Sequence, residues 1–175
     1  MDEIDIAPYD PAWPAQFETE AARLRAALEG EEIVGLEHFG STAIKGLAAK
    51  PIIDILIAVP RLSPAREYFP ARLATLDYVF WAENPKADRL FFVKGMPPYG
   101  ARRTHHVHVT EPDGEMWQRL RFRDHLHDQS DEAARYEALK RRLAAEHRND
   151  RDAYTAAKSG YVGDAMRKAG GERGN

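Results

Sequence analysis

The segment EHFGSTAIKGLAAKPIIDI, residues 37–55, decides how this chain folds. Its first half holds a turn of small residues, Gly40-Ser41-Thr42, and its second half enters an apolar run, residues 51–59, that is rich in β-branched side chains. A near-continuous apolar run of this length is typical of a strand covered on both faces. We expect the turn to follow a short strand, residues 33–36, and to open a helix of about two turns that leads into the apolar strand.

The start of that helix is a candidate phosphate site. Gly40, Ser41 and Thr42 offer backbone N–H groups and two hydroxyl groups, and the free amides at a helix N-terminus attract anions. Asp54 stands out in the strand that follows, because a carboxylate there is costly to bury unless it meets a cation, a metal ion or several hydrogen-bond donors. This layout is typical of a site for nucleotide phosphate and metal.

The second unusual segment is a strand expected over residues 103–110. Strand periodicity places His106 and His108 on one face and the intervening valines on the other. Two histidines at this spacing occur as a structural or solvated pair, and they can also reach one metal ion. If this strand neighbours the Asp54 strand, Asp54, His106 and His108 form a set of metal ligands and catalytic residues. Imidazole nitrogen favours Mn²⁺ or Zn²⁺ over Mg²⁺, and all three divalent ions are candidates.

Cationic side chains are the expected partners of ligand phosphate. Lys50 lies at the entrance of the Asp54 strand, and Lys158 lies in a C-terminal helix from which it can point back toward the sheet. An intervening helix carries arginines at alternate positions, so Arg121 lies apart from Arg119 and Arg123. We assign Lys50, Arg121, Arg123 and Lys158 to the phosphate site and expect Arg119 to be solvated.

Composition limits the class of protein. A chain of 175 residues fits one domain that buries roughly 70% of its unfolded surface. The net charge of −3 gives no reason to expect nucleic acid or membrane as a partner. Because cysteine is absent, disulfides, thiolate zinc sites and cysteine nucleophiles are excluded. No signal-like or membrane-spanning apolar run is present, so we expect a cytoplasmic protein.

The order of elements predicts an α+β class rather than a regular βαβ wind. Besides the segments above, we expect helices over residues 11–28 and 63–73, strands over 78–81 and 90–94, and a helical C-terminal third. The helices of that last third are expected over 113–128, from Ser130, and from Asn149 or Asp150, with core stripes at Tyr136, Leu139, Leu143, Tyr154, Ala157 and Tyr161. We expect one domain over residues 1–169 and a flexible tail over 170–175.

With these motifs the chain resembles the GrpB family. The matching residues are His38 to Ala43, Gly46-Leu47, Lys50 to Ile55, His106 to Val109, Phe122-Arg123-Asp124 and Ala157-Lys158, within a likeness that runs from Tyr9 to about Lys168. This resemblance implies a fold of the nucleotidyltransferase superfamily, a mixed β-sheet flanked by helices. It also implies kinship with a module that is appended to dephospho-coenzyme A kinases in some bacteria.

The chain departs from the pattern of that superfamily at two of its three carboxylates. The superfamily places two carboxylates two residues apart on the second motif strand, whereas here Asp54 is followed by Leu56. A third carboxylate, on a later strand, is replaced by the face of His106 and His108. The resemblance therefore implies one of two functions. The first is metal-dependent nucleotidyl transfer from a nucleoside triphosphate to an acceptor. The second is binding of a nucleotide or coenzyme A-like ligand without turnover, with a homodimer or a coenzyme A-pathway protein as expected partner.

Overall fold

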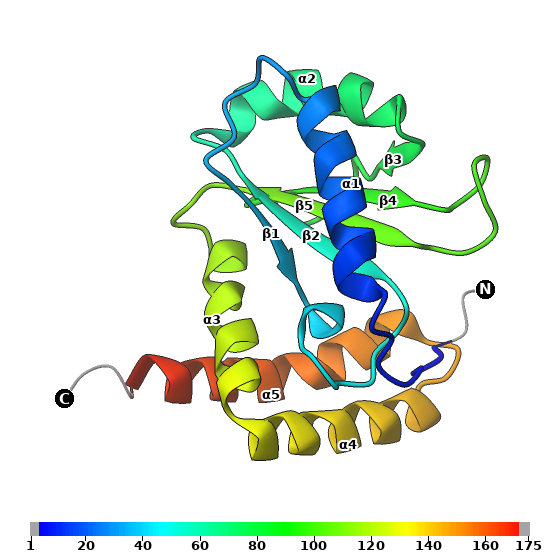
Figure 1. Ribbon diagram of the computed structural model, residues 1–175, viewed down its shortest axis with the longest axis vertical. Helices are drawn as coiled ribbons and strands as arrows, with labels where there is room; N and C mark the ends of the chain where they lie inside the picture. The colour runs from blue at the N-terminus through cyan, green and yellow to red at the C-terminus, as the bar shows by residue number, and fades with distance from the viewer. Residues whose placement is uncertain (1–3, 172–175) are drawn as a thin grey trace.

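The computed structural model describes the backbone of residues 4–171 and the side chains of residues 4–167. One mixed sheet separates two groups of helices (Figure 1). The strands are β1 (Gly35–Phe39), β2 (Ile53–Ala58), β3 (Tyr78–Phe80), β4 (Leu90–Lys94) and β5 (His105–Thr110). The helices are α1 (Trp13–Ala27), the short 3₁₀ helix η1 (Ser41–Ala43), α2 (Leu62–Ala74), α3 (Glu115–Asp128), α4 (Ser130–Glu146) and α5 (Arg151–Gly171).

The sheet has the order β1-β2-β5-β4-β3 in the described part of the chain. The central pair, β2 and β5, is parallel, and the other three neighbouring pairs are antiparallel. In the parallel register Asp54 lies opposite His106, and Leu56 lies opposite His108. The predicted α+β class with a mixed, helix-flanked sheet is confirmed.

Alternation along β2 separates the two faces of the sheet. Ile53, Ile55 and Ile57 face the main core, where they pack with residues of α1 and α2 such as Leu24 and Phe69. On the opposite face, Leu56 packs with Phe39 and with Met116 of α3. Helices α4 and α5 pack against α3 and against each other (Figure 1). Asp54 therefore lies on the face that the C-terminal helices cover.

The prediction of a two-turn helix after Gly40 is wrong. The structure forms one three-residue 3₁₀ turn there, and the chain then runs irregularly to β2. Gly46 interrupts the segment with a positive φ of 82°. Long-range hydrogen bonds then take the place of helical ones, because the Ala48 N–H donates to Glu137 at 2.9 Å and the Ala48 carbonyl accepts from Lys140. Tertiary contacts with α4 thus override the local tendency toward helix.

The remaining elements lie close to their predicted positions. Strand β1 is displaced two to three residues toward the C-terminus of its predicted range, because its pairing with β2 extends to Phe39 opposite Asp54. Helix α4 begins at Ser130, and α5 begins where the Asp150 carboxylate accepts a hydrogen bond from the Ala153 N–H at 2.9 Å. Ala157 is exposed and does not join the predicted core stripe.

Helix α5 extends through Gly171, and residues 172–175 of the predicted tail lie outside the described residues. Among the described helices, none combines the length and the apolar character that crossing a membrane requires.

A buried ion pair attaches α1 to the sheet. Glu20 is only 2% exposed, and its Oε1 accepts a hydrogen bond from Lys94 Nζ at 2.7 Å. Arg23 contacts the other carboxylate oxygen at 3.4 Å from a side chain that is 59% exposed. Burial alone raises the pKa of the Glu20 carboxyl, but Lys94 brings it below its usual value, so the carboxylate stays ionised.

We expect the substitution Lys94→Met to lower the free energy of unfolding by about 3 kcal/mol, because it leaves a buried carboxylate without its main partner. The matched substitution Arg23→Met removes an exposed partner of the same carboxylate and should cost less than about 1 kcal/mol. Urea unfolding followed by circular dichroism measures both values. Equal losses in the two variants would contradict the assignment of Lys94 as the main partner.

Candidate metal and phosphate site

The parallel pairing of β2 with β5 brings Asp54, His106 and His108 together on one face of the sheet. One potential ligand atom from each side chain lies within 4.8 Å of the other two. His106 Nδ1 and Asp54 Oδ1 form a hydrogen bond of 3.0 Å. The structure therefore assembles the set that the sequence predicted, and its role as a metal site remains a prediction.

The charge states of the set suit a divalent metal ion. Burial lowers the pKa of His106, and it lowers the pKa of His108 to about 3, so both rings are neutral at pH 7. Burial by itself raises the pKa of the Asp54 carboxyl, but the hydrogen bond from His106 and the charge of Lys50 bring it below its usual value. One carboxylate and two neutral imidazoles are the donor set that Mn²⁺ or Zn²⁺ prefers.

Two nitrogen atoms of the set have lone pairs or protons without a partner. Among the described side chains, His106 Nε2 and His108 Nδ1 are buried and form no hydrogen bond. Such atoms are uncommon in folded proteins and are costly unless a ligand satisfies them. The side chains of His106 and Asp54 are nevertheless 12% and 27% exposed, so an ion from solvent can reach them. The residues present thus fit a bound metal ion.

Aromatic side chains hold the two imidazole rings in place. The Phe91 ring packs against His106 at 5.1 Å and against His108 at 4.6 Å between ring centres. Phe39 meets His108 edge to face at 5.4 Å. Leu56, which stands where the superfamily has its second carboxylate, is fully buried. That position is therefore part of the apolar wall of the site.

The turn at residues 40–42 supports Asp54 by close approach rather than by a helix N-terminus. Gly40 has a positive φ of 71°, and a Cβ atom added there would lie 2.5 Å from Asp54 Oδ2. Thr42 is buried, with its hydroxyl 3.0 Å from His38 Nε2 and donating to the Ile52 carbonyl at 3.3 Å. The Thr42 hydroxyl is consequently engaged inside the protein. The Ser41 side chain is within hydrogen-bonding reach of the Tyr136 hydroxyl. Burial raises the pKa of Tyr136 to about 12, although the interaction with Ser41 lowers it.

Three lysines lie beside the Asp54 face: Lys140 is buried, and Lys50 and Lys158 are half-buried. Lys50 and Lys158 lie over the same ring, that of Tyr154, with their Nζ atoms 5.2 and 4.4 Å from its centre. Lys140 lies over the Tyr136 ring at 5.0 Å. The sequence predicted Lys50 and Lys158 for this site, and it missed Lys140, whose spacing of four residues from Tyr136 was the available signal.

The pKa values of all three lysines lie below the ordinary value of 10.5. Burial and neighbouring cations lower the pKa of Lys50 to about 7, that of Lys140 to about 7 and that of Lys158 to about 8. Asp54 acts in the opposite direction on Lys50 and Lys158. Each lysine therefore gains from an additional anion nearby.

The arginines of α3 are arranged differently from the sequence expectation. Arg121 is exposed, and Arg123 is held by Glu37 at 2.9 Å and by Asp124 at 2.8 Å. Arg119, which we expected to be solvated, acts electrostatically on both His108 and Lys158 and has a side chain only 37% exposed. Arg119 is thus the arginine of α3 whose charge reaches the site.

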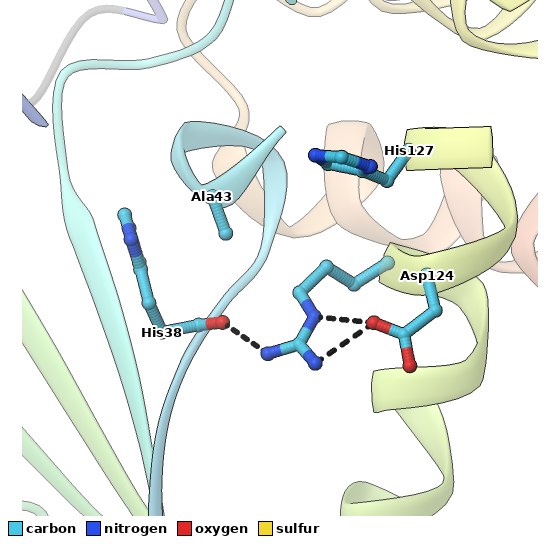
Figure 2. Close-up of a pocket in the computed structure, with 5 residues that line it drawn as sticks. His38, Ala43, Asp124 and His127 are labelled. Carbon is cyan, nitrogen blue, oxygen red and sulfur yellow. Dashed lines mark hydrogen bonds and ion pairs between the residues drawn. The ribbon is translucent and has the colours of Figure 1, made fainter. Parts of the chain in front are cut away.

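Arg123 is one of the residues that line a polar groove of about 320 Å³. Figure 2 shows His38, Ala43, Asp124 and His127 around this groove. The Arg123 Nη1 also donates to the His38 carbonyl at 2.8 Å. The groove is lined by His38, Ala43, Arg123, Asp124 and His127. Because Arg123 already has two carboxylate partners, it joins α3 to β1 and offers little charge to a phosphate ligand.

The fold and the site together define an α+β protein with one mixed sheet and an Asp-His-His cluster beside three lysines. The chain belongs to the GrpB protein family, whose sequence profile matches residues 3–168. The fold is similar to the crystal structure of the conserved protein GrpB from Enterococcus faecalis, with a TM-score of 0.82. The two sequences are 32% identical, and the match covers 94% of this chain and 96% of that one.

Curated relatives extend this comparison. A UPF0157 protein of Pseudomonas aeruginosa is 47% identical over 169 residues, which are 96% of this chain and 68% of the relative. A dephospho-CoA kinase of Mycolicibacterium paratuberculosis is 33% identical over 189 residues, covering 95% of this chain. The chain spans 46% of that kinase and 47% of the Bacillus subtilis protein YqkA, so these relatives are about twice its length.

Two glycines of the same loop test the support of Asp54. Gly40→Ala should lower the free energy of unfolding by roughly 2–4 kcal/mol and weaken metal binding, because its Cβ would overlap the Asp54 carboxylate. Gly46→Ala is the control, since Gly46 has a similar positive φ of 82° and a Cβ atom added there would have no neighbour within 4 Å. It should cost about 1–2 kcal/mol and leave metal affinity unchanged. Thermal unfolding and titration with Mn²⁺ measure both effects, and equal metal affinities would contradict the close approach.

Stability without ligand should rise with pH. The half-buried His38 has a pKa of about 4 and Lys158 one of about 8, below the ordinary values of 6.5 and 10.5. Between the folded and the ordinary pKa the unfolded chain binds more protons, so stability increases with pH in both windows. We expect the melting temperature in EDTA, without phosphate, to rise from pH 5 to 6.5 and by about 5 °C from pH 7 to 9. Lys158→Met should reduce the increase between pH 7 and 9. A melting temperature that falls above pH 7 would contradict the lowered pKa of Lys158.

Proposed function

We propose that this protein binds a nucleoside triphosphate with a divalent metal ion and transfers the nucleotidyl group to an acceptor. The observation that carries the proposal is the meeting of an ionised carboxylate and two neutral imidazoles, with unpartnered ring nitrogens, on one face of the sheet. The neighbouring lysines support it, because phosphate groups need cationic partners. Membership of the GrpB family is consistent with a nucleotidyltransferase-type fold.

In this proposal Asp54, His106 and His108 hold the ion. A bound ion would supply charge neutralisation and polarise a phosphoryl oxygen, which is the chemistry that nucleotidyl transfer needs. Lys50 and Lys158 would neutralise the remaining charge of the triphosphate. Phe91 keeps both imidazole rings in one orientation, so the ligand atoms need little rearrangement when the ion binds.

The donor set favours particular metals. Two imidazoles and one carboxylate suit Mn²⁺ or Zn²⁺ better than Mg²⁺, which prefers sites made of oxygen atoms. The apolar Leu56 is fully buried and adds no oxygen ligand. We therefore expect Mg²⁺ to be the weakest of the three ions.

A second candidate function is binding of a nucleotide or coenzyme A-like ligand without turnover. Two observations favour it. Leu56 takes the place of a carboxylate that active relatives in the wider superfamily carry, and this chain matches about half of a protein named dephospho-CoA kinase. Under this alternative the protein would act together with a coenzyme A-pathway enzyme.

Titration calorimetry of the metal-stripped protein tests the metal site. Asp54→Asn keeps the side-chain shape but removes the charge, so we expect Mn²⁺ and Zn²⁺ to bind on the order of 100-fold more weakly. The control is Asp128→Asn, because the Asp128 side chain is 77% exposed and lies at the end of α3. Unchanged affinity in Asp54→Asn, or no metal binding by the wild type, would overturn the proposed site.

Turnover then separates the two candidates. Wild-type protein loaded with Mn²⁺ is incubated with γ-labelled ATP, GTP, CTP or UTP, and released labelled pyrophosphate is measured with and without cell extract as a source of acceptor. Pyrophosphate release that is lost in Asp54→Asn supports nucleotidyl transfer. Tight binding of nucleotide or coenzyme A with no release supports the second candidate.

A further inference from the structure

The three lysines come from three separate segments of the chain. Lys50 precedes β2, Lys140 belongs to α4 and Lys158 belongs to α5. Helices α4 and α5 lie next to each other below the sheet in Figure 1 and pack against each other. Tyr136 and Tyr154 provide the rings over which the three ammonium groups lie. The cluster is therefore a product of tertiary packing and not of a local run of basic residues.

The three ammonium groups act on one another. The charge of Lys158 lowers the pKa of both Lys50 and Lys140, and the charge of Lys50 lowers the pKa of Lys140. Arg151 and Arg119 add further positive charge at Lys158. Like charges that are held close together repel, so this arrangement costs stability in the free protein.

The nearby carboxylates only partly offset this charge. Among the described residues, Asp54 acts on Lys50 and Lys158, and Glu137 acts on Lys140. The Glu137 carboxylate already accepts hydrogen bonds from the Ala48 N–H at 2.9 Å and from Arg141 at 3.1 Å. Asp54 is likewise hydrogen-bonded to His106. The cluster is left with an excess of positive charge that an anion would neutralise.

We propose that Lys50, Lys140 and Lys158 form a binding site for a diphosphate group, and that this site works without the metal ion at Asp54. A diphosphate carries several negative charges and many acceptor oxygens, which matches three ammonium groups with three N–H donors each. One donor of Lys140 is engaged by the Ala48 carbonyl, which fixes its position. The identity of the natural ligand rests on the proposed function. That ligand would be the diphosphate part of the nucleotide or of coenzyme A.

Calorimetric titration with sodium pyrophosphate in EDTA tests the site directly. We expect Lys140→Met and Lys158→Met each to weaken binding about tenfold or more, because each removes a charged hydrogen-bond donor. Asp54→Asn should bind pyrophosphate at least as tightly as the wild type, because it removes a competing negative charge. The control is Lys45→Met, since Lys45 is an exposed lysine in the same loop as Lys50.

The variants remain informative if one of them folds poorly. Lys140→Met loses the hydrogen bond to Ala48, whereas Lys158 forms no such bond among the described residues, so Lys158→Met decides in that case. We expect the melting temperature of Lys158→Met without anion to equal or exceed that of the wild type, since a half-buried charge is removed. Pyrophosphate should raise the melting temperature of the wild type and of Lys45→Met, and only weakly that of Lys158→Met.

Two results would overturn the inference. The first is a wild-type protein that does not bind millimolar pyrophosphate in EDTA. The second is binding that survives in Lys158→Met but is lost in Asp54→Asn, which would place the anion at the metal centre. Pyrophosphate binding in EDTA combined with no affinity for Mn²⁺ or Zn²⁺ would reject the proposed metal site and keep the lysine site.

Discussion

The parallel pairing of β2 with β5 is the constraint on which the rest of the structure depends. It places Asp54 directly opposite His106, and the two-residue period of the strands then puts His108 on the same face. The opposite face carries the isoleucines of the main core, which leave no freedom to shift the register by one residue. The hydrophobic core thus fixes the geometry of the polar cluster.

That polar cluster is costly to the free protein. Burial keeps His106 and His108 neutral at pH 7. It also lowers the pKa values of Lys50 and Lys140 to about 7. Each of these effects opposes folding, and a metal ion bound at the imidazoles or an anion bound at the lysines would relieve it. Binding energy and folding energy are therefore linked, as is common where a site must be kept ready for charged ligands.

The sequence predicts the fold better than it predicts the surroundings of the site. Strand periodicity is local, so the shared face of His106 and His108 follows from their spacing, and Asp54 stands out in an apolar run. Lys140 cannot be recognised in this way, because it lies in a basic stretch that looks solvated until α4 packs on the loop at Ala48. The expected helix after Gly40 fails for the same reason, since the loop's hydrogen bonds go to residues about ninety positions away.

The loss of the second carboxylate is best understood through Leu56. Its side chain packs with Phe39 and Met116, and this contact is one of those that attach α3 to the sheet. A carboxylate at that position would be desolvated among apolar groups and would favour its neutral form, which is a poor metal ligand. The fold has thus given this position to the docking of α3. Any metal chemistry must then rely on His106 and His108, whose nitrogen atoms select a softer ion than the oxygen-rich sites of the superfamily do.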